Sequence, residues 1–412
     1  MSPACNFCRA PLTEVFADLG MSPLSNAFLR ADQLSQPEAF YPLTAYVCTQ
    51  CWLVQVPQVQ TPEQIFTDYA YFSSYSESWL AHAREYCRMM QERLRLDTGS
   101  RVIEIASNDG YLLQYFAEAG IPVLGIEPAA NVAEAARVKG IETRTQFFGA
   151  AMASELPKAD LLLGNNVLAH VPDINDFVAG LRIALAPRGT ITMEFPHLMR
   201  LMEGNQFDTI YHEHFSYFSL LAVQAIFEKH GLTVVDVDEL PTHGGSLRIY
   251  AQHQGGRASR PPGEAGGRDA RPPLLARERA YGLDGVAAYR AFAERVAETK
   301  RALLAFLNTA KREGKRVAGY GAPAKGNTLL NYCGIGRDLI DYTVDRSPHK
   351  QGLFLPGTHI PIYPPEKIAE TRPDYVLILP WNLREEIAAQ MAHIREWGGK
   401  FVVPIPRVEV LD

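Results

Sequence analysis

The sequence predicts an α/β protein in which a small cysteine-containing module precedes two doubly wound α/β units. Two CxxC pairs mark roughly the first 60 residues. Apolar, strand-like runs then alternate with helical stretches over residues 100–250, and a shorter alternation follows residue 273. Such alternation is typical of a mostly parallel sheet. A chain of 412 residues is long enough for two or three domains of this kind.

The composition excludes several classes of protein. Hydrophobic residues make up 47% of the chain and charged residues 21%, as in ordinary globular proteins. The net charge of -6 comes without a basic block, which argues against a nucleic-acid partner. The sequence has no run of 18 or more apolar residues and no secretory signal at its start. We therefore expect a cytoplasmic protein without a membrane partner, and we expect a monomer.

The first element is a metal-binding module. Cys5 and Cys8 form one pair, and Cys48 and Cys51 form the other. Two residues between cysteines allow both thiolates to bind one tetrahedral ion, and two pairs complete a shell of four. Because four cysteines leave no open coordination position, we expect a structural Zn²⁺ rather than a catalytic one. The alternative is two redox dithiols, although a redox CxxC normally opens a helix in a thioredoxin-like unit.

The central unit is expected to begin with a helix over residues 76–94. The predicted strands that follow it cover residues 101–105, 123–126, 161–163, 190–195, 232–237 and 247–251. The first of these strands leads into a loop of small residues and then a helix, which is the usual place for a cofactor in such a sheet.

The loop after the first strand favours an adenosyl ligand without a pyrophosphate. Ala106 and Asn108 occupy positions where dinucleotide sites prefer glycine, because a pyrophosphate needs bare backbone amides. Ser107, Asn108 and Asp109 can instead bind an amino-acid moiety, and Glu127 can accept hydrogen bonds from ribose hydroxyls. This pattern favours S-adenosylmethionine over NAD. The residues expected to bind it are Glu104, Ala106, Ser107, Asn108, Gly110, Tyr111, Leu112, Glu127, Pro128, Asn165 and Asn166.

Four consecutive residues that can move or polarise a proton, Tyr211-His212-Glu213-His214, come after the strand at 190–195. Histidine has an unperturbed pKa near neutral pH, so it is the usual general base. A polar surface turn beside an aromatic patch is the alternative explanation of this cluster.

A segment rich in glycine, proline and arginine, residues 254–273, predicts a flexible connector. A helix is expected over residues 276–312, and strands are expected over 315–319, 339–344 and 375–379. The glycine-rich loop at 319–328 can aim backbone amides at an anion, to which Lys325 adds a full charge. A second dinucleotide site, or a duplicated domain without a ligand, are the alternatives for this unit.

Six ordered motifs resemble one family. They are residues 104–110 (EIASNDG), 165–171 (NNVLAHV), 193–197 (MEFPH), 211–219 (YHEHFSYFS), 243–248 (HGGSLR) and 319–328 (GYGAPAKGNT). Together with the four cysteines, they resemble the S-adenosylmethionine-dependent nucleotide-sugar C-methyltransferases, which methylate C3 of 4-keto deoxysugars. This sequence departs from the family at Ala106, where glycine is frequent, and at the 254–273 connector, which looks like an insertion.

The resemblance implies an architecture. It predicts a zinc-binding module at residues 1–70 and a class I methyltransferase domain with a Rossmann-like fold at 71–253. The connector at 254–273 would then lead to a second Rossmann-like α/β domain at 274–412, which holds the nucleotide. The implied substrate is a small nucleotide-sugar, usually with thymidine diphosphate.

The resemblance also implies roles for individual residues. His214 is the expected base that removes the C3 proton, while Glu213 orients a sugar hydroxyl or the imidazole. Tyr211 is expected to donate to the keto oxygen or a phosphate, and His170 and Tyr71 to line the active site. For Tyr71, packing between modules is the alternative, and Tyr69 and Tyr75 are rivals for its role. The residues expected at the substrate are His243, Gly244, Gly321, Ala324, Lys325 and Asn327.

Two other functions stay open at this point. One is an O- or N-methyltransferase that acts on another small metabolite through the same cofactor site. The other is a zinc-stabilised binding protein without catalytic activity.

Overall fold

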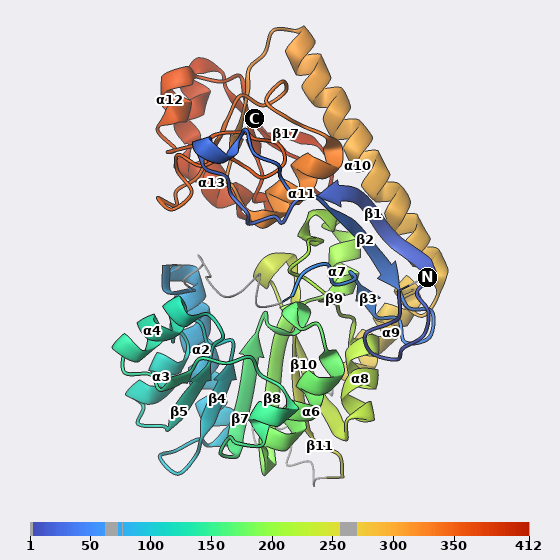
Figure 1. Cartoon of the computed structure of the whole chain (residues 1–412), viewed down its shortest axis with the longest axis vertical. Coiled ribbons are helices and arrows are strands. Elements are labelled where there is room, and N and C mark those ends of the chain that lie inside the picture. Colours follow the sequence, from blue (N-terminus) through green and yellow to red (C-terminus); the bar gives the residue numbers. More distant parts are fainter. Residues whose placement is uncertain (1–2, 62–72, 76, 256–269, 412) are drawn as a thin grey trace.

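The computed structural model describes residues 3–61, 73–75, 77–255 and 270–411, which form three β-sheets with their helices (Figure 1). Tyr71, and residues 256–269 of the connector predicted over 254–273, lie outside these ranges. The end of that prediction was wrong, because residues 271–273 already belong to a helix, Arg271–Tyr281. None of the helices within the described ranges combines the length and the apolar character that crossing a membrane requires.

The N-terminal module is built on a four-stranded sheet whose last strand comes from much later in the chain. Its order is β1-β2-β3-β9, and all three pairings are antiparallel. The strands are β1 (Glu14–Ser22), β2 (Tyr41–Val47), β3 (Val54–Gln55) and β9 (Ser216–Tyr217). Because β9 lies just after the Tyr211–His214 cluster, this sheet joins the cysteine module directly to the candidate base. The sequence did not predict this pairing.

The central domain is a seven-stranded sheet of order β10-β11-β8-β7-β4-β5-β6 with helices on both faces (Figure 1). The strands are β4 (Val102–Ile105), β5 (Val123–Ile126), β6 (Thr143–Arg144), β7 (Ala159–Asn165), β8 (Leu185–Pro196), β10 (Leu232–Leu240) and β11 (Ser246–His253). The helices are α2 (Glu77–Leu94), α3 (Leu113–Glu118), α4 (Ala130–Val138), α5 (Ala150–Ala153), α6 (Ile174–Ala184), α7 (Leu198–Glu203) and α8 (Leu220–Lys229).

The strand pairing confirms the predicted mostly parallel sheet. Strands β4 to β8 run parallel, whereas β11 is antiparallel to both β8 and β10. All four residues of β4 are buried, as expected of a central strand covered on both faces. The two-residue strand β6 was not predicted, because so short a run carries no periodic signal.

The C-terminal domain repeats the design with a six-stranded sheet of order β14-β13-β12-β15-β16-β17, in which only β17 is antiparallel among the described pairings. Its strands are β12 (Val317–Tyr320), β13 (Thr343–Val344), β14 (Ile362–Tyr363), β15 (Tyr375–Ile378), β16 (Lys400–Val403) and β17 (Glu409–Leu411). Its helices are α10 (Val286–Arg312), α11 (Ala324–Cys333), α12 (Lys367–Thr371) and α13 (Arg384–Gln390). The helix α9 (Arg271–Tyr281), which precedes them in the chain, packs against α8 and β10 of the central domain.

Two predictions for this domain were wrong in detail. The single helix expected over 276–312 is two helices, because Gly282 takes a left-handed φ of +93° that ends α9. The strand expected over 339–344 is confined to β13, which has only two residues.

The long helix α10 holds the three parts together. It runs along β1, where the Phe16 and Phe292 rings stack with centroids 4.6 Å apart (Figure 1). Nearby, Trp52 of the cysteine module stacks on Tyr289 of α10. The segment between β1 and β2 then reaches the C-terminal domain, where Leu29 pairs with Phe354.

Candidate active site and zinc centre

A cavity of about 650 Å³ lies where the central and C-terminal domains meet. One end is formed by residues that follow the parallel strands of the central sheet, among them Ala106, Glu127 and Asn165. The other end is closed by residues 323–325, at the start of α11. Carboxyl ends of parallel strands are where open α/β sheets bind ligands, so this position fits a two-substrate site.

The loop after β4 owes its conformation to two residues with left-handed backbone angles and to hydrogen bonds with Glu127. Ala106 and Asn108 have left-handed φ angles of +56° and +48°. That conformation explains why glycine suits position 106. The Glu127 carboxylate accepts hydrogen bonds from the backbone N–H of Asn108 at 3.0 Å and of Ala129 at 2.9 Å. Burial raises the pKa of Glu127, while these two bonds oppose the rise.

The predicted cofactor residues divide into two groups. Ala106, Asn108, Tyr111, Glu127, Pro128, Asn165 and Asn166 line the cavity. Glu104, Ser107, Gly110 and Leu112 are buried behind that lining. Burial raises the pKa of Glu104 well above its usual range. At Gly110, with φ +74°, an added Cβ would lie 3.0 Å from Ile141. This second group supports the loop from behind.

The sequence did not predict much of the apolar lining, including the aromatic residues Trp79, Phe147 and Phe148. Trp79 stacks near Tyr111 and meets His243 edge to face with centroids 5.3 Å apart. The two phenylalanines follow β6, the strand that was too short to predict. An aromatic pair directly after a strand would have been a usable signal, had the strand been recognised.

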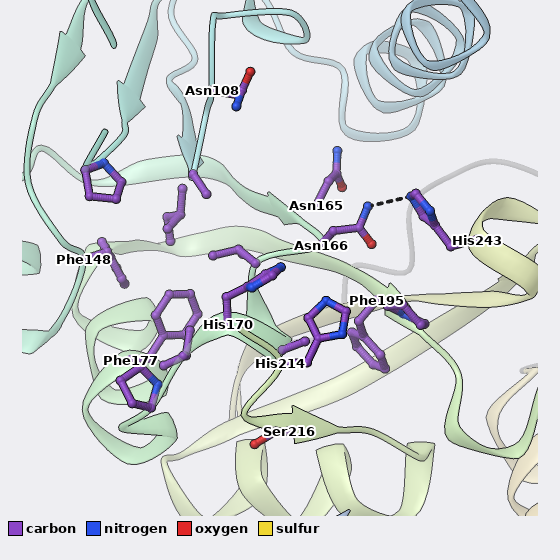
Figure 2. A pocket seen from close by; sticks show the side chains of 18 of the residues that line it. Asn108, Phe148, Asn165, Asn166, His170, Phe177, Phe195, His214, Ser216 and His243 are labelled. Atoms are coloured by element: carbon purple, nitrogen blue, oxygen red, sulfur yellow. Dashed lines mark hydrogen bonds between the residues drawn. The ribbon is translucent and has the colours of Figure 1, made fainter. Parts of the chain in front are cut away.

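His170 and His214 lie side by side in the middle of the cavity, with ring centroids 4.7 Å apart (Figure 2). The Nδ1 atom of His214 is 2.9 Å from the carbonyl of Thr209, and that of His170 is 2.8 Å from the carbonyl of Glu213. A carbonyl only accepts, so both rings carry their proton on Nδ1 and keep a lone pair on Nε2. Nε2 of His214 lies 3.0 Å from the Tyr211 hydroxyl.

Burial keeps both imidazoles neutral. It lowers the pKa of His170 to about 4, against the opposing effect of the Glu213 carbonyl. The pKa of His214 falls well below its usual range, first through burial and then through the neighbouring His170. A neutral imidazole with an unprotonated Nε2 can accept a proton at neutral pH.

Glu213 and His212 point to different surroundings. The Glu213 carboxylate is buried and accepts a 2.6 Å hydrogen bond from the Asn26 side chain of the cysteine module. Burial raises the pKa of Glu213 to about 7, and the Asn26 bond lowers it. His212 instead packs edge to face on Tyr41, and its Nε2 lies 3.2 Å from the carbonyl of Pro42. Neither residue lines the cavity itself.

At the far end, His243, Ala324 and Lys325 line the cavity. Asn166 donates a 3.0 Å hydrogen bond to Nε2 of His243, which links the cofactor loops to this end (Figure 2). The other three residues predicted at the substrate lie outside the lining. Gly244 packs against Gln206, Gly321 against Pro380, and the Asn327 amide donates to the carbonyl of Ser25 at 2.6 Å.

The four predicted cysteine ligands converge in the N-terminal module, where their sulfur atoms all lie within 4.8 Å of one another. Sγ of Cys5 is 3.6 Å from that of Cys51, and Sγ of Cys8 is 3.4 Å from that of Cys48. Tetrahedral zinc with Zn–S bonds of about 2.3 Å requires sulfurs about 3.8 Å apart, so the geometry fits. Gln55 donates to Sγ of Cys5 at 3.2 Å and so supports the ligand shell.

Three family models match successive parts of the chain. Residues 5–66 match a family described as "Putative zinc binding domain", residues 79–237 match "Methyltransferase domain", and residues 241–406 match "C-methyltransferase C-terminal domain". The chain is 39% identical over 397 residues to the C-methyltransferase NovU of Streptomyces niveus, covering 95% of this chain and 93% of the relative. The chain belongs to this C-methyltransferase family.

Solved methyltransferases resemble part of the C-methyltransferase chain at low identity. Magnesium protoporphyrin IX methyltransferase from Synechocystis, with bound SAH, has a TM-score of 0.35 and 15% identity, covering 42% of this chain and 83% of that one. A methyltransferase from Mesorhizobium loti has a TM-score of 0.35 and 16% identity, covering 42% of this chain and all 100% of that one.

The family membership decides among the activities that the sequence left open. This protein is an S-adenosylmethionine-dependent C-methyltransferase with a zinc-binding module, as predicted from its motifs. The cavity fits the cofactor chemically: the buried Oδ1 of Asn166 has no hydrogen-bond partner among the described residues and suits an ammonium group. The carboxylate of Glu127 suits the ribose hydroxyls.

Proposed function

We propose that this C-methyltransferase methylates C3 of a nucleotide-linked 4-keto deoxysugar, with thymidine diphosphate as the expected carrier. The observation that carries the proposal is the pair of neutral histidines beside the cofactor loops. His214 lines a cavity that also receives Lys325 from the other domain, and its Nε2 is unprotonated and, among the residues that the structure describes, hydrogen-bonded only to the Tyr211 hydroxyl. A ligand with an acidic C–H bond at one end and an anion at the other suits this arrangement.

In the proposed reaction, His214 is the base. A 4-keto group makes the C3 proton acidic, and Nε2 of His214 accepts that proton as the electrons move onto the keto oxygen. The Tyr211 hydroxyl donates to Nε2 of His214 at 3.0 Å, and we assign it to turn toward the developing oxyanion in the reaction, which leaves the Nε2 lone pair for the C3 proton. When bound, S-adenosylmethionine would supply an electrophilic methyl group: the new C3–CH₃ bond would form as the S–CH₃ bond breaks, which leaves S-adenosylhomocysteine. The two domains hold the partners in line.

The remaining groups are assigned to positioning the sugar. His170 lies next to His214 and is a second neutral imidazole whose proton is on Nδ1. Glu213 is tied to Asn26 outside the cavity lining, so of its two predicted roles we keep that of orienting the imidazole of His214, through the loop. We assign the diphosphate to Lys325 and the N-terminal amides of α11, and the nearby sugar to His243. Tyr71 keeps its predicted role at the substrate.

The domain limits stay a prediction from the sequence, with the methyltransferase domain at 71–253 and the nucleotide domain at 274–412. We infer that the nucleotide lies against the C-terminal domain, since that domain contributes the cation. A monomeric state in the cytoplasm also stays a prediction.

Hydrogen exchange at C3 tests this function. The protein is incubated in deuterium oxide with a thymidine-diphosphate 4-keto-6-deoxysugar and S-adenosylhomocysteine, so that no methyl group can be transferred. We expect deuterium at C3 with the wild-type protein and none with His214→Asn. With S-adenosylmethionine present, the product should carry a new C–CH₃ group. A product methylated on oxygen, or no exchange by the wild type, would refute the proposal.

A further inference from the structure

One tryptophan at the domain junction contacts both a cation and a carboxylate. Nζ of Lys325 lies 4.3 Å from the centre of the Trp381 ring, over its face. At the edge of the same ring, Nε1 of Trp381 donates a 2.7 Å hydrogen bond to Oδ2 of Asp208. A carboxylate on the indole N–H makes the ring face more negative, which strengthens its attraction for the ammonium group. Asn382, the residue after Trp381, also accepts a hydrogen bond from Lys325.

Asp208 is fully buried, so its charge acts through little solvent. It lies in a short 3-10 helix, η4 (Phe207–Thr209), which packs against α11. The second oxygen of Asp208, Oδ1, has no hydrogen-bond partner in the part of the chain that the structure covers. Such a carboxylate is costly to bury unless a nearby cation compensates it, and Lys325 is the cation that acts on it.

The same short helix also holds the candidate base. Thr209, the residue after Asp208, provides the carbonyl that accepts the hydrogen bond from Nδ1 of His214. Lys325 is partly exposed and lines the cavity, as do Thr209 and His214. Asp208 is thus linked to Lys325 of the C-terminal domain through Trp381, and to His214 of the central domain through Thr209.

We propose that Asp208 is a positioning residue that keeps Lys325 charged for an anionic group of the substrate and fixes that charge relative to His214. The inference rests on the proposed function, since it takes the anion to be the substrate's diphosphate. Asp208 lies outside the cavity lining and acts on the ligand only through Lys325 and Trp381.

The electrostatics give the inference a measurable consequence. Desolvation lowers the pKa of Lys325 to about 8, and Asp208 is the group that raises it. Burial raises the pKa of Asp208 to about 6, and Lys325 lowers it. His243, the other titratable group that interacts with Lys325, is kept neutral because burial lowers its pKa. Without Asp208 the lysine should therefore lose its proton at a lower pH.

The test measures the affinity of the full-length protein for inorganic pyrophosphate by calorimetry, at pH 6.5 and at pH 8.5. Asp208→Asn removes the charge and keeps the size of the side chain. Trp381→Phe removes the N–H donor and keeps a ring beneath Lys325. Trp397→Phe is the matched control, because Nε1 of Trp397 donates to the carbonyl of Pro373, away from the cavity. Lys325→Met reports whether the lysine binds the anion at all.

Loss of an opposite charge typically lowers a lysine pKa by about one unit. Relative to wild type, Asp208→Asn should therefore bind pyrophosphate within about twofold at pH 6.5 and about tenfold more weakly at pH 8.5. The pyrophosphate affinity of Trp381→Phe should also fall at pH 8.5, and the affinity of Trp397→Phe should equal that of the wild type. If Asp208→Asn does not fold, as judged by thermal unfolding, Trp381→Phe decides.

The outcomes separate this inference from the proposed function. If Lys325→Met weakens pyrophosphate binding but the ratio of Asp208→Asn to wild type is the same at both pH values, only the role of Asp208 is refuted. If Lys325→Met binds pyrophosphate as well as the wild type, the diphosphate assignment in the proposed function is refuted together with it.

Discussion

Replacing His214 by asparagine is the most direct perturbation of the proposed chemistry. The asparagine amide can still donate to the Thr209 carbonyl, which Nδ1 of His214 now reaches at 2.9 Å, so the loop should keep its shape. What disappears is the lone pair of Nε2, which lies 3.0 Å from the Tyr211 hydroxyl. General base catalysis typically contributes about 10²–10⁴-fold, which corresponds to about 3–5 kcal/mol of activation free energy.

The assay is steady-state methyl transfer to the keto sugar, with cofactor affinity measured separately by calorimetry. We expect kcat of His214→Asn to fall by about 10²–10⁴-fold while the affinity for S-adenosylmethionine stays close to wild type. His212→Asn is the matched control, since His212 lies in the same motif but contacts Pro42 and lies outside the cavity lining. Its kcat should stay within a few-fold of wild type.

The pH dependence gives a second check on the base. Burial and the neighbouring His170 lower the pKa of His214. The imidazole therefore stays neutral, and able to accept a proton, at pH values where an ordinary histidine is already protonated. The loss of kcat/KM caused by protonation of His214 should thus occur below about pH 6.5. If His214→Asn keeps more than about a tenth of the wild-type kcat, His214 is not the base, because loss of a general base should lower kcat by at least about 10²-fold.

Two further predictions concern the zinc module and the cofactor loop. Removal of zinc by a chelator should lower both the melting temperature and kcat, because β3 of the module pairs with β9, directly after His214; full activity of the metal-free protein would contradict this. Ala106→Gly should raise the free energy of unfolding by about 1 kcal/mol, since a left-handed φ of +56° disfavours residues with a Cβ. Denaturant titration checks it, and an unchanged or lower stability would count against the strain.

Local patterns predicted most of the framework. The apolar run of β4 and the acid at the end of β5 are readable because periodicity and strand ends are properties of short segments. The four cysteines were predictable as one cluster because the metal itself demands their spacing. The break at Gly282 was also readable in principle, since glycine often ends a helix, but a continuous helical pattern on both sides concealed it.

Contacts between distant segments account for most of what the sequence could not provide. Asp208 and Trp381 are separated by 173 positions, and neither residue carries a motif that points to the other. The same holds for Asn26, whose amide meets Glu213 from the other side of a domain boundary. Gly244, Gly321 and Asn327 were chosen as substrate residues from their motifs, yet all three lie outside the cavity lining. A motif identifies a loop, whereas packing determines which of its residues face the ligand.

The position of β9 connects the cysteine module to the candidate base through a short chain of contacts. Gln55 donates to the zinc ligand Cys5 and pairs in β3 with Ser216 of β9. Phe215, one residue earlier, accepts from the N–H of Val56 and donates its own N–H to the carbonyl of Ala169, next to His170.

The backbone on both sides of the histidine pair is therefore fixed from the zinc module. A two-residue strand pair has little stability of its own, so its geometry depends on the metal-stabilised sheet. We therefore infer that a zinc ion held by the four cysteines would act on catalysis through the backbone that positions His170 and His214, at a distance from the reacting atoms.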